Sequence, residues 1–545
     1  MKMKKILISA FLLSLAAGAG AQGWTDALNY SDVDYLGTAR SVGLGNAMTA
    51  VGGDLGSLTF NPAGSAVAGY SQFTITPGLS VSTVFSQGSL MDEYDAPVCF
   101  QDPVTERMSR LKVPNFGVMT VFDTHNRSGL KRVSFGLVGN MTRDYTNRIL
   151  ASGTNVNTTV AGSLASQADG FPTSVVGGGY DQDLDIQPSW ESMVGFHSGI
   201  FSAVPGKDNL YSGVTERVLD NGNRALAGRI GQQYKLQRSG YKYDLLMNVG
   251  LDFNDRFFLG ANVGVVSLNY REDETRSEEA AGEGFPTRFQ SLRARSSFRD
   301  EGDGVYLKVG FIARPFDGLR IGAAIQTPTL MQIREEYALE GCSVVDGSVL
   351  LRSTPKDEWY YNLTTPFRAN AGLAYTFGKV AMLSADYEYT DYRGMRFSVY
   401  DDYAYDFSMA NLDIQDLTGA VHAVRAGLEL KPAQSLAIRV GYNLTTGAQY
   451  NYLTDDGDVA PLLGEDRTAQ IRTAVSFGLG YSSSDSFFAD FAVRFQYLPN
   501  EYITPYYYYF RDAKGKLYKD LDVPVPELCA SSSVCNALLT LGWRF

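Results

Sequence analysis

The sequence predicts an all-β fold, a 14-stranded antiparallel barrel that spans a membrane and holds a small, partly helical segment in its lumen. Composition is the first reason: charged residues make up 19% of the chain, against about 25% in ordinary soluble domains, while aromatic residues reach 12% and glycines number 56. Alternation of apolar with small or polar residues is the second, because it recurs along the whole chain. The third is that no run beyond the first 21 residues approaches the ~18 apolar residues of a membrane helix.

The first 21 residues differ from the rest of the chain. Lysines at positions 2, 4 and 5 precede an apolar run at 6–17, and the small residues 19–21 resemble a cleavage site. This pattern is typical of a secretory signal peptide, with cleavage expected after Ala21. We therefore expect the mature chain to be exported to the cell outer membrane of a Gram-negative bacterium.

The segment 22–70 is rich in glycine and alanine and precedes the first predicted strand. It contains the run from Gly37 to Asp54 and, shortly after it, Asn61-Pro62-Ala63-Gly64. Asparagine followed by proline is typical of a helix N-cap and first helical position, so a short helix should begin there. A segment this compact and small in its side chains predicts a hatch inside a barrel formed by residues 71–545.

Counting alternating segments from the amino end predicts 14 strands, an even number as in other single-chain bacterial barrels. They lie near 71–86, 112–123, 131–144, 241–253, 256–271, 303–314, 318–334, 363–376, 379–391, 418–431, 435–447, 468–481, 486–504 and 534–545. Tight turns such as Asn254-Asp255 alternate with long loops, the largest at about 145–240. This asymmetry predicts periplasmic turns, extracellular loops and both chain ends on the periplasmic side.

The last predicted strand shows the alternation most clearly. Its odd positions are apolar, namely Ala537, Leu539, Leu541, Trp543 and Phe545, and the positions between them are mostly small or polar. One face therefore suits lipid and the other a lumen. A terminal aromatic residue is typical of the last strand of outer-membrane barrels, and we expect the barrel-assembly machinery to bind it. An edge strand of a secreted sandwich is the alternative.

The N-terminal motifs resemble those of the FadL/TodX family of outer-membrane transporters for long-chain fatty acids and other hydrophobic compounds. The resemblance is carried by Ala39-Arg40, Gly45-Asn46-Ala47, Gly52-Gly53-Asp54 and Asn61-Pro62-Ala63-Gly64, in that order and ahead of the first strand. It implies that the hatch plugs the lumen. It also implies that a kink in the third strand opens a lateral passage into the membrane, so passive transport of hydrophobic molecules is the expected function.

The third predicted strand has two glycines that could mark such an opening. Phe135, Leu137 and Met141 are expected to face lipid, while Gly136 and Gly139 interrupt the two faces. Glycine inside a strand often marks a bulge or a close approach of another backbone. We expect the strand to break near these glycines, opposite the Asn61–Gly64 end of the hatch, with ordinary barrel curvature as the alternative.

A stripe in the largest loop is one candidate for contact with a ligand. Trp190, Met193, Val194 and Phe201 fall at helical spacing on one face, where they could form an entry groove. The alternative is that the stripe packs the loop onto the barrel rim.

Inward-facing arginines are the second candidate. Arg425, Arg439 and Arg472 could hold a ligand carboxylate through charge-assisted hydrogen bonds. The alternative is a ladder in which they pair with inward acids such as Glu429, since charges inside barrels are generally paired.

The four cysteines are expected on the external side, in an oxidising compartment. We predict a bridge between Cys529 and Cys535, with Cys99–Cys342 as a second candidate pair.

Other functions find little support in the sequence. A net charge of −12 gives nucleic acid no reason to bind. The three histidines are widely separated, and neither a Gly-x-Ser-x-Gly elbow nor a Walker sequence occurs, so we expect no catalytic residue, metal or cofactor. The expected partners are a hydrophobic small molecule, outer-membrane lipid and lipopolysaccharide. A hydrophilic porin is the main alternative, followed by an adhesin or enzyme barrel.

Overall fold

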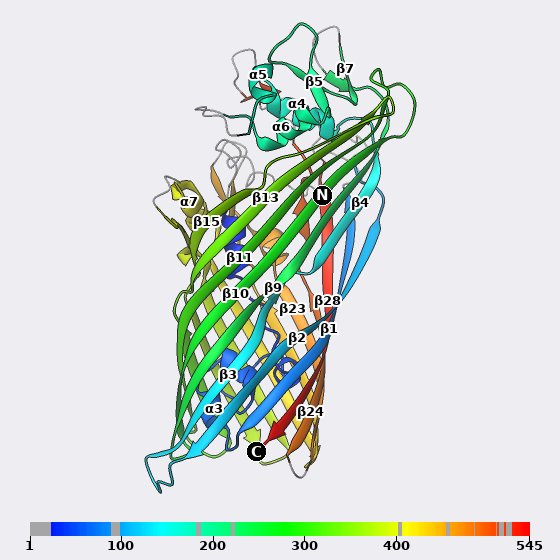
Figure 1. The fold of residues 1–545 in the computed structure, drawn as a ribbon. Coiled ribbons are helices and arrows are strands. Elements are labelled where there is room, and N and C mark those ends of the chain that lie inside the picture. The colour runs from blue at the N-terminus through cyan, green and yellow to red at the C-terminus, as the bar shows by residue number, and fades with distance from the viewer. Residues whose placement is uncertain are drawn as a thin grey trace.

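The computed structural model describes residues 23–88, 99–180, 187–219, 224–401, 406–453, 458–483, 486–507, 510–511, 517–518 and 526–545. The expected signal peptide lies outside these residues. The described chain forms a closed, 14-stranded antiparallel barrel. A cap that contains the helices at 160–168, 173–176 and 190–197 lies over one end (Figure 1). Among the described helices, none is long and apolar enough to cross a membrane.

The barrel wall confirms the predicted strand count. In order around the ring, the 14 wall strands are β1 (Gln72–Gly88), β2 (Val104–Asp123), β3 (Leu130–Asp144), β9 (Ile230–Phe253), β10 (Phe257–Ala280), β11 (Phe289–Ala313), β12 (Leu319–Gln326), β16 (Arg368–Phe377), β17 (Ala381–Asp391), β19 (Ala420–Ala433), β20 (Leu436–Thr445), β23 (Arg472–Ser482), β24 (Phe487–Tyr497) and β28 (Leu528–Arg544). Strand β28 closes the ring because it pairs with β1 along its whole length.

The other elements extend the wall, form the loops or lie in the lumen. The remaining strands are β4 (Asn147–Asn155), β5 (Phe201–Ala203), β6 (Tyr211–Gly213), β7 (Glu216–Val218), β8 (Arg224–Leu226), β13 (Leu330–Val345), β14 (Ser348–Ser353), β15 (Asp357–Thr364), β18 (Arg396–Val399), β21 (Asn451–Leu453), β22 (Val459–Pro461), β25 (Glu501–Ile503), β26 (Phe510–Arg511) and β27 (Leu517–Tyr518). The helices are α1 (Trp24–Ser31), α2 (Ala39–Gly43), η2 (Leu55–Thr59), α3 (Gly64–Val67), α4 (Val160–Ala168), α5 (Thr173–Val176), α6 (Trp190–His197), η3 (Tyr392–Gly394), α7 (Ser408–Leu417) and α8 (Gly464–Thr468).

Two predicted strands are interrupted at the same level of the wall. The segment 318–334 is divided into β12 and β13, and 363–376 into β15 and β16. Pro328 and Pro366 stand at the two interruptions, where a residue without an N–H cannot donate to the ladder. The neighbouring threonines keep the strands together, because the Thr365 N–H donates to the Thr329 carbonyl at 2.9 Å.

The predicted loop at 145–240 contains more strand than expected. Strand β4 and the start of β9 lie within it, and β9, β10 and β11 run 24, 24 and 25 residues. These strands extend well past the rest of the wall toward the cap (Figure 1). The apolar alternation stops where both faces of a strand meet polar surroundings, which is why the sequence pattern indicated a loop there.

The outer face of the wall is apolar and the inner face polar, the reverse of a soluble protein. On β11, Val305, Leu307 and Val309 are 48%, 54% and 48% exposed, whereas Tyr306 and Lys308 between them point inward and are 3% and 1% exposed. Exposed apolar side chains in this alternation are the lipid-facing band of a membrane barrel.

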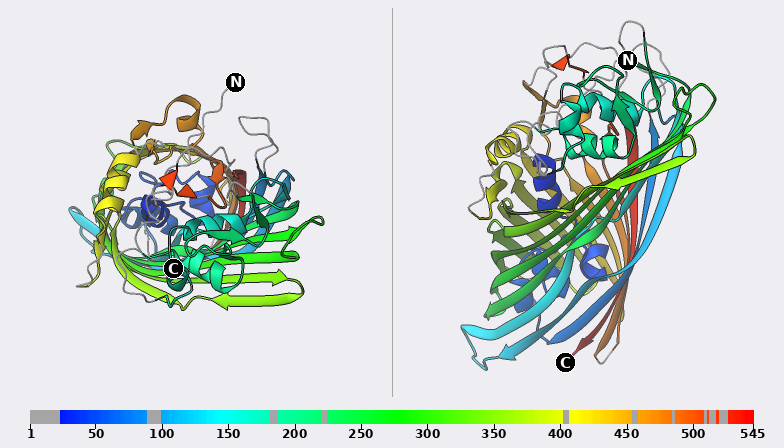
Figure 2. Two further views of the ribbon diagram at one scale, coloured as in Figure 1. Left: turned by 90° about the horizontal axis from the view of Figure 1, so that it is seen from above. Right: turned by 45° about the horizontal axis from the view of Figure 1, so that its top comes forward.

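The N-terminal helices α1, α2, η2 and α3 lie inside the ring, as seen from above in Figure 2. Leu44, Met48 and Leu58 of this hatch are fully buried. The helix predicted at Asn61-Pro62 begins slightly later, at Gly64, and the Asn61 side chain accepts the Ala63 N–H at 3.0 Å. This largely buried segment fills the lumen and has the polar wall residues as its partners.

Candidate functional site

The Asn-Pro-Ala-Gly motif fixes the hatch to the wall. The Asn61 side-chain amide donates to the Thr49 carbonyl at 2.8 Å and to the Phe311 carbonyl of β11 at 2.9 Å. Gly260 and Gly310 leave room for the motif, because a Cβ at either position would lie 2.3 Å from Pro62 or Asn61. Arg40 lies on another side of the hatch and pairs with Glu429 at 3.2 Å. The motif residues therefore anchor the hatch to the barrel.

The wall parts between β2 and β3. Their ladder runs from Asp123↔Arg132 to Asn115↔Asn140 and ends there, although β2 continues upward paired with β1. The next backbone pairing between the two sides is the isolated bridge Asp102↔Ser152. Between these two points the edges of β2 and of β3–β4 have no mutual β-ladder among the described residues.

Pro114 explains where the ladder ends. It follows Val113 in β2 and has no N–H to donate to β3, and the β1–β2 register shifts at the same level, around Pro77. Both prolines lie inside predicted strands. Their positions in the sequence therefore indicated where the β2–β3 ladder ends, and the prediction based on glycines missed this signal.

The expected break at Gly136 and Gly139 is wrong. Strand β3 pairs continuously past both glycines, with β2 on one side and β9 on the other. Their small size serves packing instead, because a Cβ at Gly139 would lie 2.5 Å from the Phe116 ring and one at Gly136 would lie 3.4 Å from Leu58 of the hatch. Met141, expected to face lipid, is 5% exposed.

The hatch takes the place of β2 on the free edge of β3. The Leu36 N–H donates to the Met141 carbonyl at 3.0 Å, and the Asp34 N–H donates to the Thr142 carbonyl at 2.7 Å. A bulge between Met141 and Arg143 in the β3–β9 ladder turns both carbonyls toward the hatch. The inner side of the gap is therefore closed by hatch residues 34–36.

Polar side chains bridge the upper part of the gap. Lys112 of β2 donates to Asp144 at 2.9 Å, and Arg110 donates to the Thr146 hydroxyl at 3.0 Å. These contacts replace the missing ladder, and side chains can separate more readily than paired backbones.

Ion pairs hold the same hatch segment to both sides of the lumen. Asp32 accepts from Arg143 of β3 at 2.7 Å and from both terminal nitrogens of Arg472 of β23, at 2.6 and 2.8 Å. Asp34 pairs with Arg494 of β24 at 2.5 Å. Burial alone would raise the pKa of Asp32, but the guanidiniums of Arg472 and Arg143 outweigh it and hold that pKa well below its usual range.

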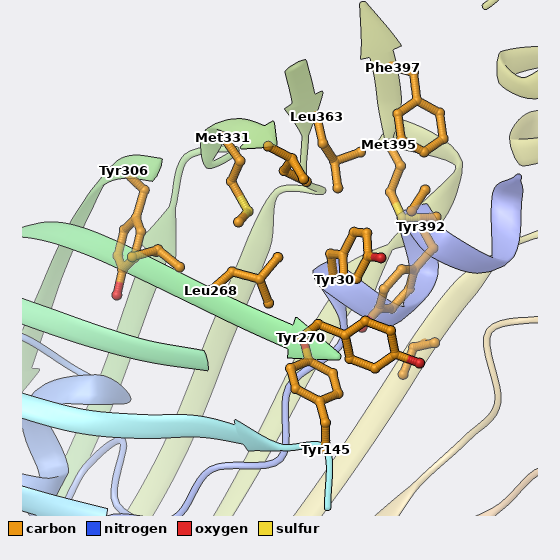
Figure 3. Packing of buried hydrophobic residues seen from close by; sticks show 14 of the residues in the cluster. Tyr30, Tyr145, Leu268, Tyr270, Tyr306, Met331, Leu363, Tyr392, Met395 and Phe397 are labelled. Atoms are coloured by element: carbon orange, nitrogen blue, oxygen red, sulfur yellow. The ribbon is translucent and has the colours of Figure 1, made fainter. Parts of the chain in front are cut away.

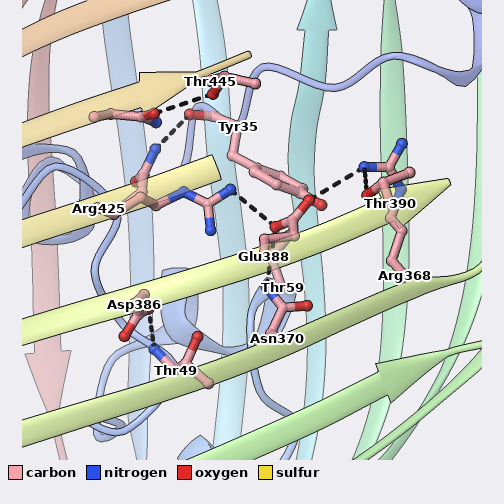
Figure 4. Close-up of polar contacts among 12 residues, drawn as sticks. Tyr35, Thr49, Thr59, Arg368, Asn370, Asp386, Glu388, Thr390, Arg425 and Thr445 are labelled. Atoms are coloured by element: carbon pink, nitrogen blue, oxygen red, sulfur yellow. Dashed lines mark hydrogen bonds and ion pairs between the residues drawn. The ribbon is translucent and has the colours of Figure 1, made fainter. Parts of the chain in front are cut away.

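An arginine-lined pocket lies beside hatch residues 33–35. Its volume is about 20 Å³, which is room for a water-sized group, and its lining includes Arg425, Arg472 and Arg494 together with Asp34. Arg425 donates to Glu388 at 2.8 Å, as Figure 4 shows, but its Nε and Nη1 are buried with no partner within the described residues. The same is true of Nη1 of Arg494.

The three predicted arginines therefore differ in their surroundings. Arg439 is paired with Glu429 at 2.7 Å and with Asp490 at 2.5 Å, as the ladder alternative predicted. Arg425 and Arg472 line the pocket. Arg494 was not predicted, although its inward position in the alternation of the segment 486–504 would have indicated it.

The upper lumen is lined by aromatic and apolar side chains. Figure 3 shows Tyr30 of α1 facing Tyr270 of β10, with their ring centres 5.8 Å apart, and Tyr145 packs on Tyr270 at 5.1 Å. The Tyr30 hydroxyl donates to Asp300 at 2.5 Å. Other members of this buried cluster are Leu268, Tyr306, Met331, Leu363, Tyr392, Met395 and Phe397.

The stripe in the largest loop packs the cap. Met193, Val194 and Phe201 are 1%, 4% and 0% exposed, and Trp190 of the same stripe is partly buried. The Phe201 ring lies 5.5 Å from Tyr211 in the core of the cap. These contacts fit the packing alternative.

The predicted disulfides are absent. All four cysteines are free. Cys529 and Cys535 lie six positions apart on the single strand β28, which separates them by about 20 Å at ~3.3 Å per residue, far beyond the reach of a disulfide. Cys99 instead contacts the Asn155 amide at 2.6 Å, and Cys342 lies in β13.

No protein-family model and no curated protein matches the sequence. Among solved structures, a FadL homologue from Pseudomonas aeruginosa aligns with a TM-score of 0.52 at 12% identity, over 94% of this chain and 99% of that chain. The toluene transporter TodX from P. putida aligns with a TM-score of 0.45 at 13% identity, over 93% of this chain and 98% of that chain. The first alignment establishes a shared fold at low identity. The protein therefore has the barrel fold of the P. aeruginosa FadL homologue.

Proposed function

We propose that the protein is a passive outer-membrane channel for hydrophobic small molecules, such as long-chain fatty acids or aromatic hydrocarbons, which leave the lumen sideways between β2 and β3. The observation that carries the proposal is the gap in the wall above Asn115 and Asn140, covered from inside by the hatch. Unpaired strand edges at membrane depth are tolerated only where protein covers them. A cover made of a separate segment can move without opening the rest of the barrel.

The energetics favour such a route. A hydrophobic molecule gains about 0.8 kcal/mol for each methylene that leaves water, so it partitions into a bilayer without an energy source. The barrier is the charged outer surface of the membrane, and a lined tunnel past that surface suffices.

No catalytic step is part of the proposal. The outer face would contact membrane lipid and lipopolysaccharide, and β28 would be the strand that the assembly machinery recognises.

A photoreactive probe tests the exit. Cells that display the barrel would be given a diazirine-bearing long-chain fatty acid or a diazirine-bearing alkylbenzene, illuminated, and the labelled peptides mapped by mass spectrometry. Labels should concentrate on the two edges of the gap, at 110–115 and 141–146. Equal labelling of the opposite wall, β17 and β19, would contradict a localised exit.

Conductance separates the proposal from the porin alternative. The hatch is buried and anchored to several wall strands, so the purified barrel in a planar bilayer should conduct ions poorly. A steady, porin-like conductance would favour the hydrophilic channel.

The arginine pocket supports a carboxylate-bearing ligand. We propose that Arg425, Arg472 and Arg494 hold a carboxylate there, since Arg425 and Arg494 have buried N–H groups without partners among the described residues. Replacing Arg425 with Gln should weaken binding of a long-chain fatty acid and leave binding of the alcohol of equal length unchanged. If Arg425→Gln weakens binding of the acid and of the alcohol equally, the substitution perturbs the barrel and Arg425 does not recognise the carboxylate.

A further inference from the structure

One tyrosine closes the same gap from the outside. Tyr243 of β9 lies opposite Met141 in the β3–β9 ladder, and its hydroxyl reaches across β3 and donates to the Val113 carbonyl of β2 at 2.5 Å. The contact therefore joins two strands that are separated by the strand whose edge is free.

The Val113 carbonyl needs this partner. Val113 and Pro114 lie in the register shift of the β1–β2 ladder, opposite Pro77, and the β2–β3 ladder ends one residue later at Asn115. Leu111 and Phe116, on either side, are 80% and 45% exposed, so this part of β2 lies in the lipid-facing band. A backbone carbonyl has no partner in hydrocarbon, so leaving one unpaired there is unfavourable.

We infer that Tyr243 is the outer latch of the lateral passage. The inference rests on the function proposed above and assigns to this residue the control of exit. The inner side of the gap is closed by backbone bonds from Asp34 and Leu36 of the hatch, and the outer side by the Tyr243–Val113 bond. A molecule that leaves between β2 and β3 at this level has to separate both closures.

The chain offers a matched control. Tyr241 lies two residues away on the same face of β9, 36% exposed, and its ring packs on that of Tyr243 with centres 5.3 Å apart. Its hydroxyl has no hydrogen-bond partner in the described part of the chain. Removing the Tyr241 hydroxyl therefore changes the same aromatic pair without touching the latch.

The experiment measures uptake of radiolabelled palmitate, and separately of ethylbenzene, by a Gram-negative host strain that lacks its own channel of this kind. The proteins are the unmodified barrel, Tyr243→Phe and Tyr241→Phe, each alone and combined with Asp32→Asn, which weakens the inner closure. Loss of one net hydrogen bond predicts an initial uptake rate about two- to tenfold higher for Tyr243→Phe, and a change below twofold for Tyr241→Phe. Heat-modifiable migration on a gel checks that every variant is assembled.

The outcomes separate the two proposals. A rise for Tyr243→Phe in either background, with Tyr241→Phe unchanged, supports the latch. If the unmodified barrel imports a probe and Tyr243→Phe imports it at the same rate in both backgrounds, the latch is wrong and the passage stands. If the unmodified barrel imports neither probe above the empty strain, the proposed function fails and the latch with it.

Discussion

Removing the charge of Asp32 should release the hatch from the free edge of β3. In Asp32→Asn, Arg143 and Arg472 lose the carboxylate that both contact within 2.8 Å. Breaking a buried ion pair by removing one partner costs about 3–5 kcal/mol. The cost here should be smaller, about 2–3 kcal/mol, because Asp32, Arg143 and Arg472 are 14%, 22% and 16% exposed and because asparagine retains one acceptor. The opening equilibrium of residues 32–36 should then rise about 30- to 150-fold.

Hydrogen exchange followed by mass spectrometry measures this opening. The amides of Asp34 and Leu36, which bond to the β3 carbonyls, should exchange faster by that factor in Asp32→Asn, while the amides of β23 keep their protection. Asp346→Asn is the control, because its pair with Arg288 is 63% and 76% exposed and surface pairs contribute little. Exchange of the 32–36 peptide within threefold of the unmodified protein would refute the reasoning.

The pH dependence of the same segment has a defined sign. The pKa of Asp32 is held below its usual range in the folded protein, so its contribution to stability is present above the unfolded pKa of about 3.9 and is lost as the pH falls below it. In acid, the protection of residues 32–36, measured against the unfolded chain at the same pH, should therefore fall to that of Asp32→Asn. Protection of 32–36 that is unchanged down to about pH 2 would contradict this sign.

Three further outcomes are expected. Burial raises the pKa of Asp26 to about 6, so the contribution of its protonated carboxyl to stability is present below the unfolded pKa of about 3.9 and is lost as the pH rises through 6; the α1 amides, compared with the unfolded chain at the same pH, should be less protected from exchange at neutral pH than at about pH 4. Thiol titration of unreduced, denatured protein should find four reactive groups, and a Cys529–Cys535 bridge would lower that number to two. Gly139→Val should place its side chain against the Phe116 ring and destabilise the barrel by about 1–3 kcal/mol, measured as a lower temperature of heat modification; unchanged migration would show that the ring moves freely.

The strands and the hatch motif were accessible from the sequence. Alternation is a local property, so it located all 14 wall strands, and the Asn254-Asp255 turn is present, with φ values of 59° and 56° at its two central residues. The Asn61-Pro62 pair indicated a capped turn for the same reason. Inward positions followed from the period of two, which placed Arg425, Arg439 and Arg472 in the lumen.

The state of each lumenal charge could not be read from that pattern. Arg439 pairs with Asp490 of another wall strand, 51 positions away, and Arg494 pairs with Asp34 of the hatch, 460 positions away. The disulfide prediction failed for a related reason, because closeness in sequence along an extended strand is distance in space.

The sequence by itself determined a membrane barrel with an N-terminal hatch, since composition, alternation and turn chemistry act through neighbouring residues. Only the tertiary structure decided where the wall parts. Glycine makes a break in a strand possible, but Leu58 and Phe116 occupy the space beside Gly136 and Gly139, and both glycines remain paired with β2. The ladder ends instead where Pro114 removes a donor and the hatch backbone supplies a competing partner for β3, a competition between segments distant in the chain.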